Sequence, residues 1–235
     1  MEPLNPDQLA MGLIWLVAFL FSTTCHEAAH ALVAWKLGDP TAYEGGQVSL
    51  NPIPHIQREP VGMIAVPIIS YLFAGWMMGW ASAPYDPWWA DRHPKRAAWM
   101  ALAGPVSNLI LVLLAGGLIH LGIASGHFVP PESLNFLHLV EAGPEGSSGL
   151  AKVLSIFFTL NLLLFVFNLL PLPPLDGSGV LPLFIPEDMA RRYQEFMRQW
   201  SLVGLVVAWS IFREIFMPIF RFAVDILYPG MYVSS

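Results

Sequence analysis

The sequence predicts an all-α protein that crosses a membrane several times, with about four to six membrane segments. Hydrophobic residues make up 55% of the 235-residue chain and charged residues only 12%, a composition typical of proteins that lie in a bilayer. Four apolar stretches reach the roughly 20 residues that a helix needs to span the hydrocarbon core, and a fifth carries four charges. These stretches cover residues 10–36, 61–82, 97–124, 149–170 and about 199–228. We expect one membrane domain over residues 1–235, with a core at about 10–185 and a C-terminal span and interfacial tail at about 186–235.

The first apolar stretch contains the motif H-E-A-A-H at residues 26–30. On a helix, positions four apart share a face, so His26 and His30 can bind one zinc ion with Glu27 beside them as the general base. Ionisable groups at membrane depth are costly, which makes a functional site the default interpretation. The residues before this stretch lack the basic character of a signal peptide, so we expect it to be retained as a span.

Each of the two segments that follow has two possible structures. Residues 37–60, which hold several glycines and prolines, are expected to form a small irregular or β element. Pro67 and Gly75 could break the stretch 61–82 into a re-entrant hairpin, which is tolerated where it lines a cavity enclosed by protein. The alternative is a full span, and we prefer the hairpin because it returns the chain to the side that it left.

Basic residues in the short loops predict the orientation. Arg92, Lys95 and Arg96 precede the third stretch, and Arg191, Arg192 and Arg198 precede the last one, so both loops are expected in the cytoplasm. The connection 125–149 contains no Lys or Arg but has three glutamates, so it is expected outside. The last stretch is expected to be one span at about 200–220, followed by a tail that lies in the interface.

A third zinc ligand is predicted in N-L-L-P-L-P-P-L-D-G at residues 168–177. The prolines end the incoming helix as it reaches the cytoplasmic side, so unwound backbone can aim Asp176 at a metal, and Gly177 permits a tight turn after it. Charge favours the grouping, because Asp176 and Glu27 together neutralise one Zn²⁺ while the histidines are neutral ligands. We therefore expect one zinc ion per chain, held by the two histidines and Asp176.

Three alternative functions are weighed against this one. A di-iron site would need a second E-x-x-H on another helix, and the sequence has none. A metal transporter would spread polar residues through the whole membrane depth, whereas here they gather at one end. A catalytically silent regulator would most easily have lost Glu27 or a ligand. Nucleic acid is not an expected partner, because the net charge is −6 and no long basic run occurs.

The motifs resemble those of the site-2 proteases, the intramembrane zinc metalloproteases of peptidase family M50, in their compact bacterial form without accessory domains. H-E-A-A-H and N-L-L-P-L-P-P-L-D-G match two family signatures, and A-G-P-V-S-N at residues 103–108 resembles a third. The resemblance implies a three-helix metalloprotease core formed by the first, third and fourth stretches. It also implies an active site that faces the cytoplasm in a bacterial plasma membrane, with Glu27 as the base.

The resemblance further implies regulated intramembrane proteolysis, the hydrolysis of peptide bonds within or near transmembrane segments. The partners would be transmembrane protein or peptide substrates and the lipid bilayer, with gating by the membrane segments themselves or by a regulatory partner in the membrane. Substrate helices must unwind, since helical hydrogen bonds shield their peptide bonds. An extended substrate could then pair with an edge near Val48, in residues 40–60.

Three further polar residues are candidates for the site. Asn108 and Asn168 lie in predicted spans, where an amide is costly unless it is paired. They could hold the substrate backbone, orient Asp176, or lock the helices together through hydrogen bonds. His55 lies on the cytoplasmic side and could line the entrance to the site.

Overall fold

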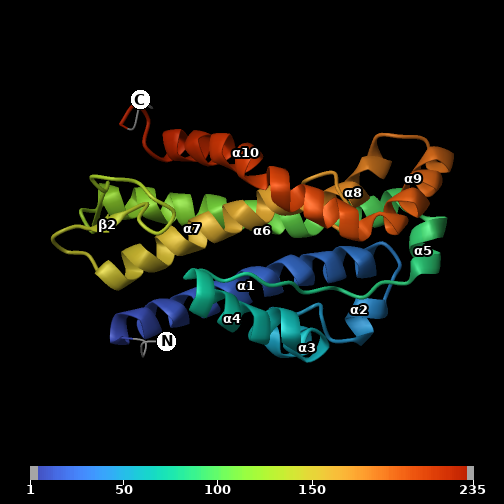
Figure 1. Cartoon of the computed structure of the whole chain (residues 1–235), viewed down its shortest axis with the longest axis horizontal. Coiled ribbons are helices and arrows are strands. Elements are labelled where there is room, and N and C mark those ends of the chain that lie inside the picture. The colour runs from blue at the N-terminus through green and yellow to red at the C-terminus, as the bar shows by residue number, and fades with distance from the viewer. Residues whose placement is uncertain (1–4, 232–235) are drawn as a thin grey trace.

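Four long helices dominate the computed structural model, which describes residues 5–231 (Figure 1). They are α1 Pro6–Lys36, α6 Pro94–Ala124, α7 Ser148–Asn168 and α10 Ser201–Leu227. All four are long and apolar enough to cross a membrane. The prediction of an all-α protein with several membrane segments is therefore confirmed.

The helices α1, α6 and α7 pack against one another and form the core. Small buried residues on α6, such as Ala98 and Ala115, allow its neighbours to approach closely. Large apolar side chains on the outward faces, including Leu13, Leu113 and Leu121, are exposed. This arrangement is typical of a bundle whose outer surface contacts lipid.

The segment after α1 was expected to be either irregular or β. Residues 37–60 form turns and two short helices, α2 Thr41–Glu44 and α3 Pro52–Arg58. No strand forms anywhere in these residues, all of which the structure describes, so the β alternative is wrong and the irregular one holds. Asn51 caps α3 by accepting a hydrogen bond from Ile53 N–H, and the two prolines of α3 have no N–H to donate to a strand ladder.

Residues 61–86 form a hairpin with one helical arm and one extended arm. The helical arm consists of the π-helical turn η1 Val61–Ala65 and α4 Val66–Ala74. Gly75, at φ 76°, ends this arm. Residues 77–86, here called the return segment, form no helix or strand and run to α5 as a long extended trace (Figure 1). Trp80 N–H donates to Gly62 O at 3.1 Å, which ties the two arms together. The structure thus shows the hairpin and not the full span.

The two ends of the bundle differ in character (Figure 1). At one end, the loop between α6 and α7 contains β1 Phe128–Val129 and β2 Glu141–Ala142, an antiparallel pair that holds the only strands in the described chain. At the other end lie the short helices α5 Pro87–Arg92, α8 Asp176–Val180 and α9 Glu187–Gln199, with the 3₁₀ turn η2 Leu181–Leu183 after α8. The basic loops therefore lie at one end and the glutamate-bearing loop at the other, as the orientation argument requires.

The C-terminal helix is longer than predicted. A span to about residue 220 with an interfacial tail was expected because four charged residues follow Ile211, but α10 continues unbroken through Pro218 to Leu227. Its buried residues recur about every four positions, at Phe216, Phe220, Val224 and Leu227, and pack against α7 and the loop that precedes it. The charged side chains point to the exposed face, so they do not interrupt the helix.

Candidate active site

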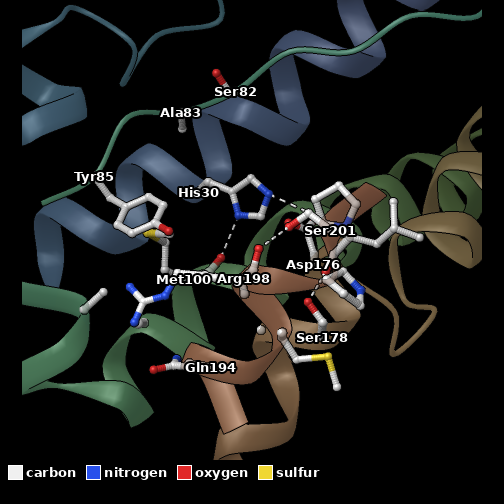
Figure 2. Close-up of a pocket in the computed structure, with 18 of the residues that line it drawn as sticks. His30, Ser82, Ala83, Tyr85, Met100, Asp176, Ser178, Gln194, Arg198 and Ser201 are labelled. Atoms are coloured by element: carbon white, nitrogen blue, oxygen red, sulfur yellow. Dashed lines mark hydrogen bonds and ion pairs between the residues drawn. The ribbon is translucent and has the colours of Figure 1, made fainter. Parts of the chain in front are cut away.

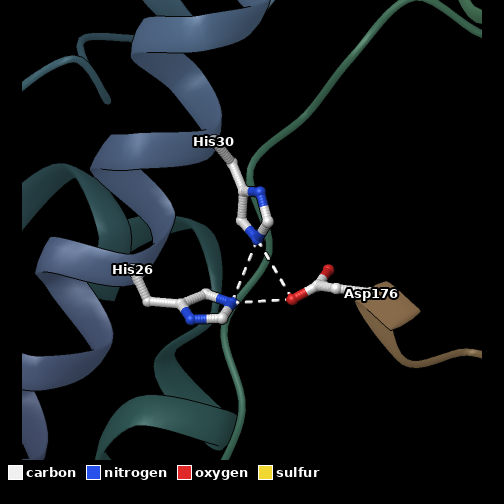
Figure 3. Close-up of side chains that lie close together, drawn as sticks. All are labelled: His26, His30 and Asp176. Carbon is white, nitrogen blue, oxygen red and sulfur yellow. Dashed lines mark hydrogen bonds and ion pairs between the residues drawn. The ribbon is translucent and has the colours of Figure 1, made fainter. Parts of the chain in front are cut away.

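Three side chains converge where α1 faces the start of α8 (Figure 3). Nε2 of His26 lies 3.0 Å from Nε2 of His30 and 3.0 Å from Oδ2 of Asp176, and Nε2 of His30 lies 3.3 Å from the same oxygen. Within residues 5–231, this is the one group of three or more His, Cys, Asp or Glu side chains whose ligand atoms could hold a metal ion. Both histidines are buried.

Local sequence explains how the carboxylate reaches the histidines. The helix α7 ends at Asn168, the proline-rich residues 169–175 turn back, and Asp176 is the first residue of α8. A side chain at Gly177 would collide with the carbonyl oxygens of Leu169 and Leu170. The Asp-Gly pair therefore lets the turn pack tightly against the end of α7 and directs the carboxylate toward α1.

The partners of the remaining ring nitrogens determine where each histidine carries its proton. Nδ1 of His30 donates to the backbone oxygen of Met100 at 2.7 Å, and Nδ1 of His26 donates to Oδ1 of Asn108 at 2.6 Å. A carbonyl oxygen only accepts a hydrogen bond, so each ring has its proton on Nδ1. Both Nε2 atoms therefore direct lone pairs at each other and at the carboxylate of Asp176.

This cluster of acceptor atoms fits a zinc ion. Three acceptors without a proton between them repel one another unless a cation lies among them. Tetrahedral zinc, with ligand distances of about 2.0–2.2 Å, separates its ligand atoms by about 3.3 Å, close to the 3.0–3.3 Å found here. Nitrogen and carboxylate donors from three side chains, with a fourth position left for water, are typical of catalytic zinc.

The helix α6 approaches the two imidazole rings through a glycine. A Cβ atom at Gly104 would collide with Nε2 of both His26 and His30. One turn further along the same helix, Asn108 accepts the hydrogen bond from His26. The motif A-G-P-V-S-N thus contributes two features of the site, namely space for the imidazole rings and a partner for one of them.

A cavity of about 400 Å³ adjoins the cluster (Figure 2). Glu27, which is buried on α1, lines it together with His30 and Asp176. Figure 2 shows Ser82, Ala83 and Tyr85 of the return segment on one side and Gln194 of α9 on the other. At the exposed part of the lining, Arg198 donates to Asp91 at 3.3 Å and links α9 to α5. The arrangement can hold a peptide and a water molecule beside a metal ion and a carboxylate base.

Comparison with protein families identifies the chain. The model of peptidase family M50 matches residues 14–211, which include all of the converging side chains. The chain belongs to peptidase family M50. This M50 protein is a membrane zinc metalloprotease whose cofactor is Zn²⁺, and its likeness to the site-2 proteases is confirmed.

Relatives of this M50 protein carry names that agree with a zinc metalloprotease. It is 36% identical over 193 residues to "Putative zinc metalloprotease YwhC" of Bacillus subtilis, covering 82% of this chain and 78% of YwhC. It is 28% identical over 196 residues to "Putative zinc metalloprotease Rip2" of Mycolicibacterium smegmatis, covering 83% of this chain and 66% of that protein. The protein of the same name from Mycobacterium tuberculosis is 27% identical over 208 residues, covering 88% and 70% respectively. No solved structure matches the chain.

The remaining candidate residues of the M50 protein lie in different surroundings. Asn108 contacts His26 and not Asp176. Asn168 donates to Leu164 O within its own helix at 3.0 Å, outside the cluster. His55 is buried, with Nε2 3.1 Å from Ser49 O, and does not line the cavity. The structure therefore brings Asn108 into the site and leaves Asn168 and His55 out of it.

Sequence reasoning missed several contributors to the site. Asn161, on α7, contacts Asn108, and the only sequence signal for it was an amide inside an apolar span. The backbone oxygen of Met100 has no sequence signature. The return segment and α9 line the cavity, although no sequence pattern assigned either of them to the site.

Proposed function

We propose that this protein hydrolyses peptide bonds within or near transmembrane segments of membrane-protein substrates. In this proposal His26, His30 and Asp176 hold one zinc ion and Glu27 is the general base. One observation carries it: the ligand atoms of three side chains converge beside a cavity that Glu27 also lines, at one end of a bundle of helices long enough to cross a membrane. A binding or transport site would not need a buried carboxylate beside the cluster that is not one of its ligands.

The proposed chemistry divides between the metal and the chain's own residues. When bound, zinc polarises the scissile carbonyl and lowers the pKa of a water molecule. The Glu27 carboxylate accepts a proton from the attacking water and then delivers it to the nitrogen of the leaving amine. The hydrogen bonds from His26 to Asn108 and from His30 to Met100 hold the two rings in the orientation in which Nε2 is unprotonated. Burial of the cluster limits the access of bulk water.

The substrate is expected to bind in extended form. A peptide bond inside a helix is shielded by its own hydrogen bonds, so a transmembrane substrate must unwind locally before it is cut. No strand forms near Val48, where an edge was predicted, but the return segment is extended and its residues 81–83 and 85 line the cavity. We infer that the substrate backbone lies along this segment as an added strand.

The proposed setting is the plasma membrane of a bacterium, with the site toward the cytoplasm. The site lies at the same end of the bundle as α5 and α9, where Arg92, Arg192 and other basic residues gather, and basic loops favour the cytoplasmic side. The whole chain would act as one membrane domain. Regulated intramembrane proteolysis would then require gating by the membrane segments or by a regulatory membrane partner.

Metal analysis of the purified protein tests the proposed ligands. We expect about one zinc ion per chain in the wild type, and loss of zinc together with cleavage of a transmembrane peptide in His30→Asn and Asp176→Asn. His127→Asn, which changes an exposed histidine at the opposite end of the bundle, serves as the matched control and should retain zinc. Full zinc content in His30→Asn and Asp176→Asn would contradict the assignment.

A further inference from the structure

We propose that Asn161 is a positioning residue that acts through Asn108 to set the tautomer of His26, that is, to keep the ring proton on Nδ1 and not on Nε2. The inference rests on the proposed zinc site and extends it to a residue on the third helix of the core. Asn161 lies on α7, Asn108 on α6 and His26 on α1, and all three side chains are buried. The chain of contacts therefore crosses the whole three-helix core.

The contacts form a continuous series. Nδ2 of Asn161 donates to the backbone oxygen of Phe157 at 2.8 Å and to Oγ of Ser22 at 2.9 Å. Oδ1 of Asn161 accepts from Nδ2 of Asn108 at 2.9 Å. Oδ1 of Asn108 then accepts from Nδ1 of His26 at 2.6 Å.

The direction of the bonds in the series follows from its first member, and a longer contact from Nδ2 of Asn108 to the backbone oxygen of Ser22 at 3.5 Å has the same direction. The oxygen of Phe157 can only accept, so the Asn161 atom that faces it must be the NH₂ group. In this orientation the Asn161 oxygen faces Asn108. The Asn108 group that donates a hydrogen bond to it must therefore be NH₂. The oxygen of Asn108 is then left to face His26, whose Nδ1 must carry the proton. The lone pair of His26 is thereby placed on Nε2, the atom that faces His30 and Asp176.

A purely structural role for Asn161 and Asn108 would not require their hydrogen bonds to run in this direction. Amides that only hold helices together stabilise a bundle whichever way each one points. Here Asn108 and Asn161 are both fully buried, and reversing either amide would set oxygen against oxygen or NH₂ against NH₂. Groups that hydrogen-bond a metal-binding histidine typically change metal affinity by about 10–100-fold when they are removed. Asn161 reaches His26 only through such a group, Asn108, so an effect at the lower end of this range is expected.

The first measurement uses metal-free protein and therefore does not depend on activity. Protein labelled with ¹⁵N-histidine reports the proton position through the ¹⁵N chemical shifts of Nδ1 and Nε2, and the His26 signals are assigned by their loss in His26→Asn. We expect the wild type to hold His26 with the proton on Nδ1. Asn161→Leu removes the amide but keeps the side-chain volume. In this variant both the Nδ1–H and the Nε2–H tautomers of His26 should be populated, and the Kd for zinc should rise about tenfold.

Two further variants separate positioning from stability. Ser155→Ala removes a buried hydroxyl from the same helix, where it accepts from Leu139 N–H and Val140 N–H far from the site, and should change neither readout. Ser22→Ala removes one acceptor of Asn161. It should change the His26 shifts and the Kd for zinc in the same direction as Asn161→Leu does, but by less. It therefore provides a test if Asn161→Leu does not fold. Unchanged His26 shifts in Asn161→Leu, or in Ser22→Ala if that protein alone folds, would overturn the proposal. An equal loss of zinc affinity in Ser155→Ala would also overturn it. Failure of the zinc assignment itself would show separately, as wild-type protein that binds no zinc.

Discussion

Gly104 shows at the residue scale how little space separates α6 from the metal site. Its backbone lies so close to the two Nε2 atoms that even a methyl group would collide with both. Inserting a methyl group into a tightly packed site typically costs about 1–3 kcal/mol, and here the displaced atoms would be the proposed ligands themselves. Gly104 is therefore expected to matter for metal binding more than for folding.

Replacing Gly104 by Ala should lower zinc affinity at least about tenfold, because the imidazole rings must move away from Asp176. Gly117→Ala, on the same helix, is the matched control, since a Cβ there meets no atom within 4 Å outside the backbone of its own helix. Competition with a chelator of known affinity measures both variants. Equal zinc affinity in the two proteins would show that α6 does not confine the site.

The metal-binding motifs and the candidate Asn108 could be predicted from the sequence, but the other groups that support them could not. His26 and His30 follow from helical periodicity alone, and the proline-rich turn before Asp176 is a local signal. Asn161 is different, because its partners lie 53 residues away on α6 and 139 residues away on α1. An amide in an apolar span shows only that some partner exists, and finding that partner requires knowing which helix faces meet.

At the scale of elements, the return segment is the part of the fold that the sequence described least well. The hairpin preferred for residues 61–82 is what the structure shows, but nothing in the sequence indicated that the arm after Gly75 would be extended. Of the irregular or β element expected in residues 37–60, the irregular alternative holds, because the prolines and Asn51 favour a capped helix there. The extended backbone lies instead beside the cavity, which is where a substrate strand would need it.

The proposed strand pairing predicts a specific effect at Ala83. Replacing Ala83 by Pro removes one backbone N–H from the cavity wall, and the loss of one hydrogen bond to substrate, about 0.5–1.5 kcal/mol, should lower kcat/KM by up to about tenfold. Zinc content should not change. Ala83→Ser keeps the N–H and should cleave at the wild-type rate, so equal kcat/KM for the Pro and Ser variants would rule out pairing at this residue.

At the scale of the whole molecule, the arrangement of charges predicts how the bundle sits in its membrane. Lys95 lies at the end that carries the site, and Glu132 lies in the loop at the opposite end. The overall predictions from hydropathy and loop charge agree with the four long helices. Among these four, the last helix continues beyond the predicted end of its span, because its charged residues occupy an exposed face that sequence averages do not distinguish.

Cysteine labelling in intact cells tests this orientation. In a Cys25→Ala background, Glu132→Cys should react with a membrane-impermeant maleimide, whereas Lys95→Cys should react only after the membrane is made permeable. Both substituted positions are exposed, so differences in labelling report sidedness and not burial. The reverse pattern would place the site outside.

The central claim is that Glu27 drives peptide-bond hydrolysis at the metal site. The most direct measurement compares new protein termini in membranes of cells that express the wild type or Glu27→Gln, a change that keeps the side-chain shape and the ligands. We predict termini within or near transmembrane segments in the wild type, and a loss of about 10²–10⁴-fold in their rate of appearance in the variant, with zinc retained. The same termini at the same rate in both would contradict the claim.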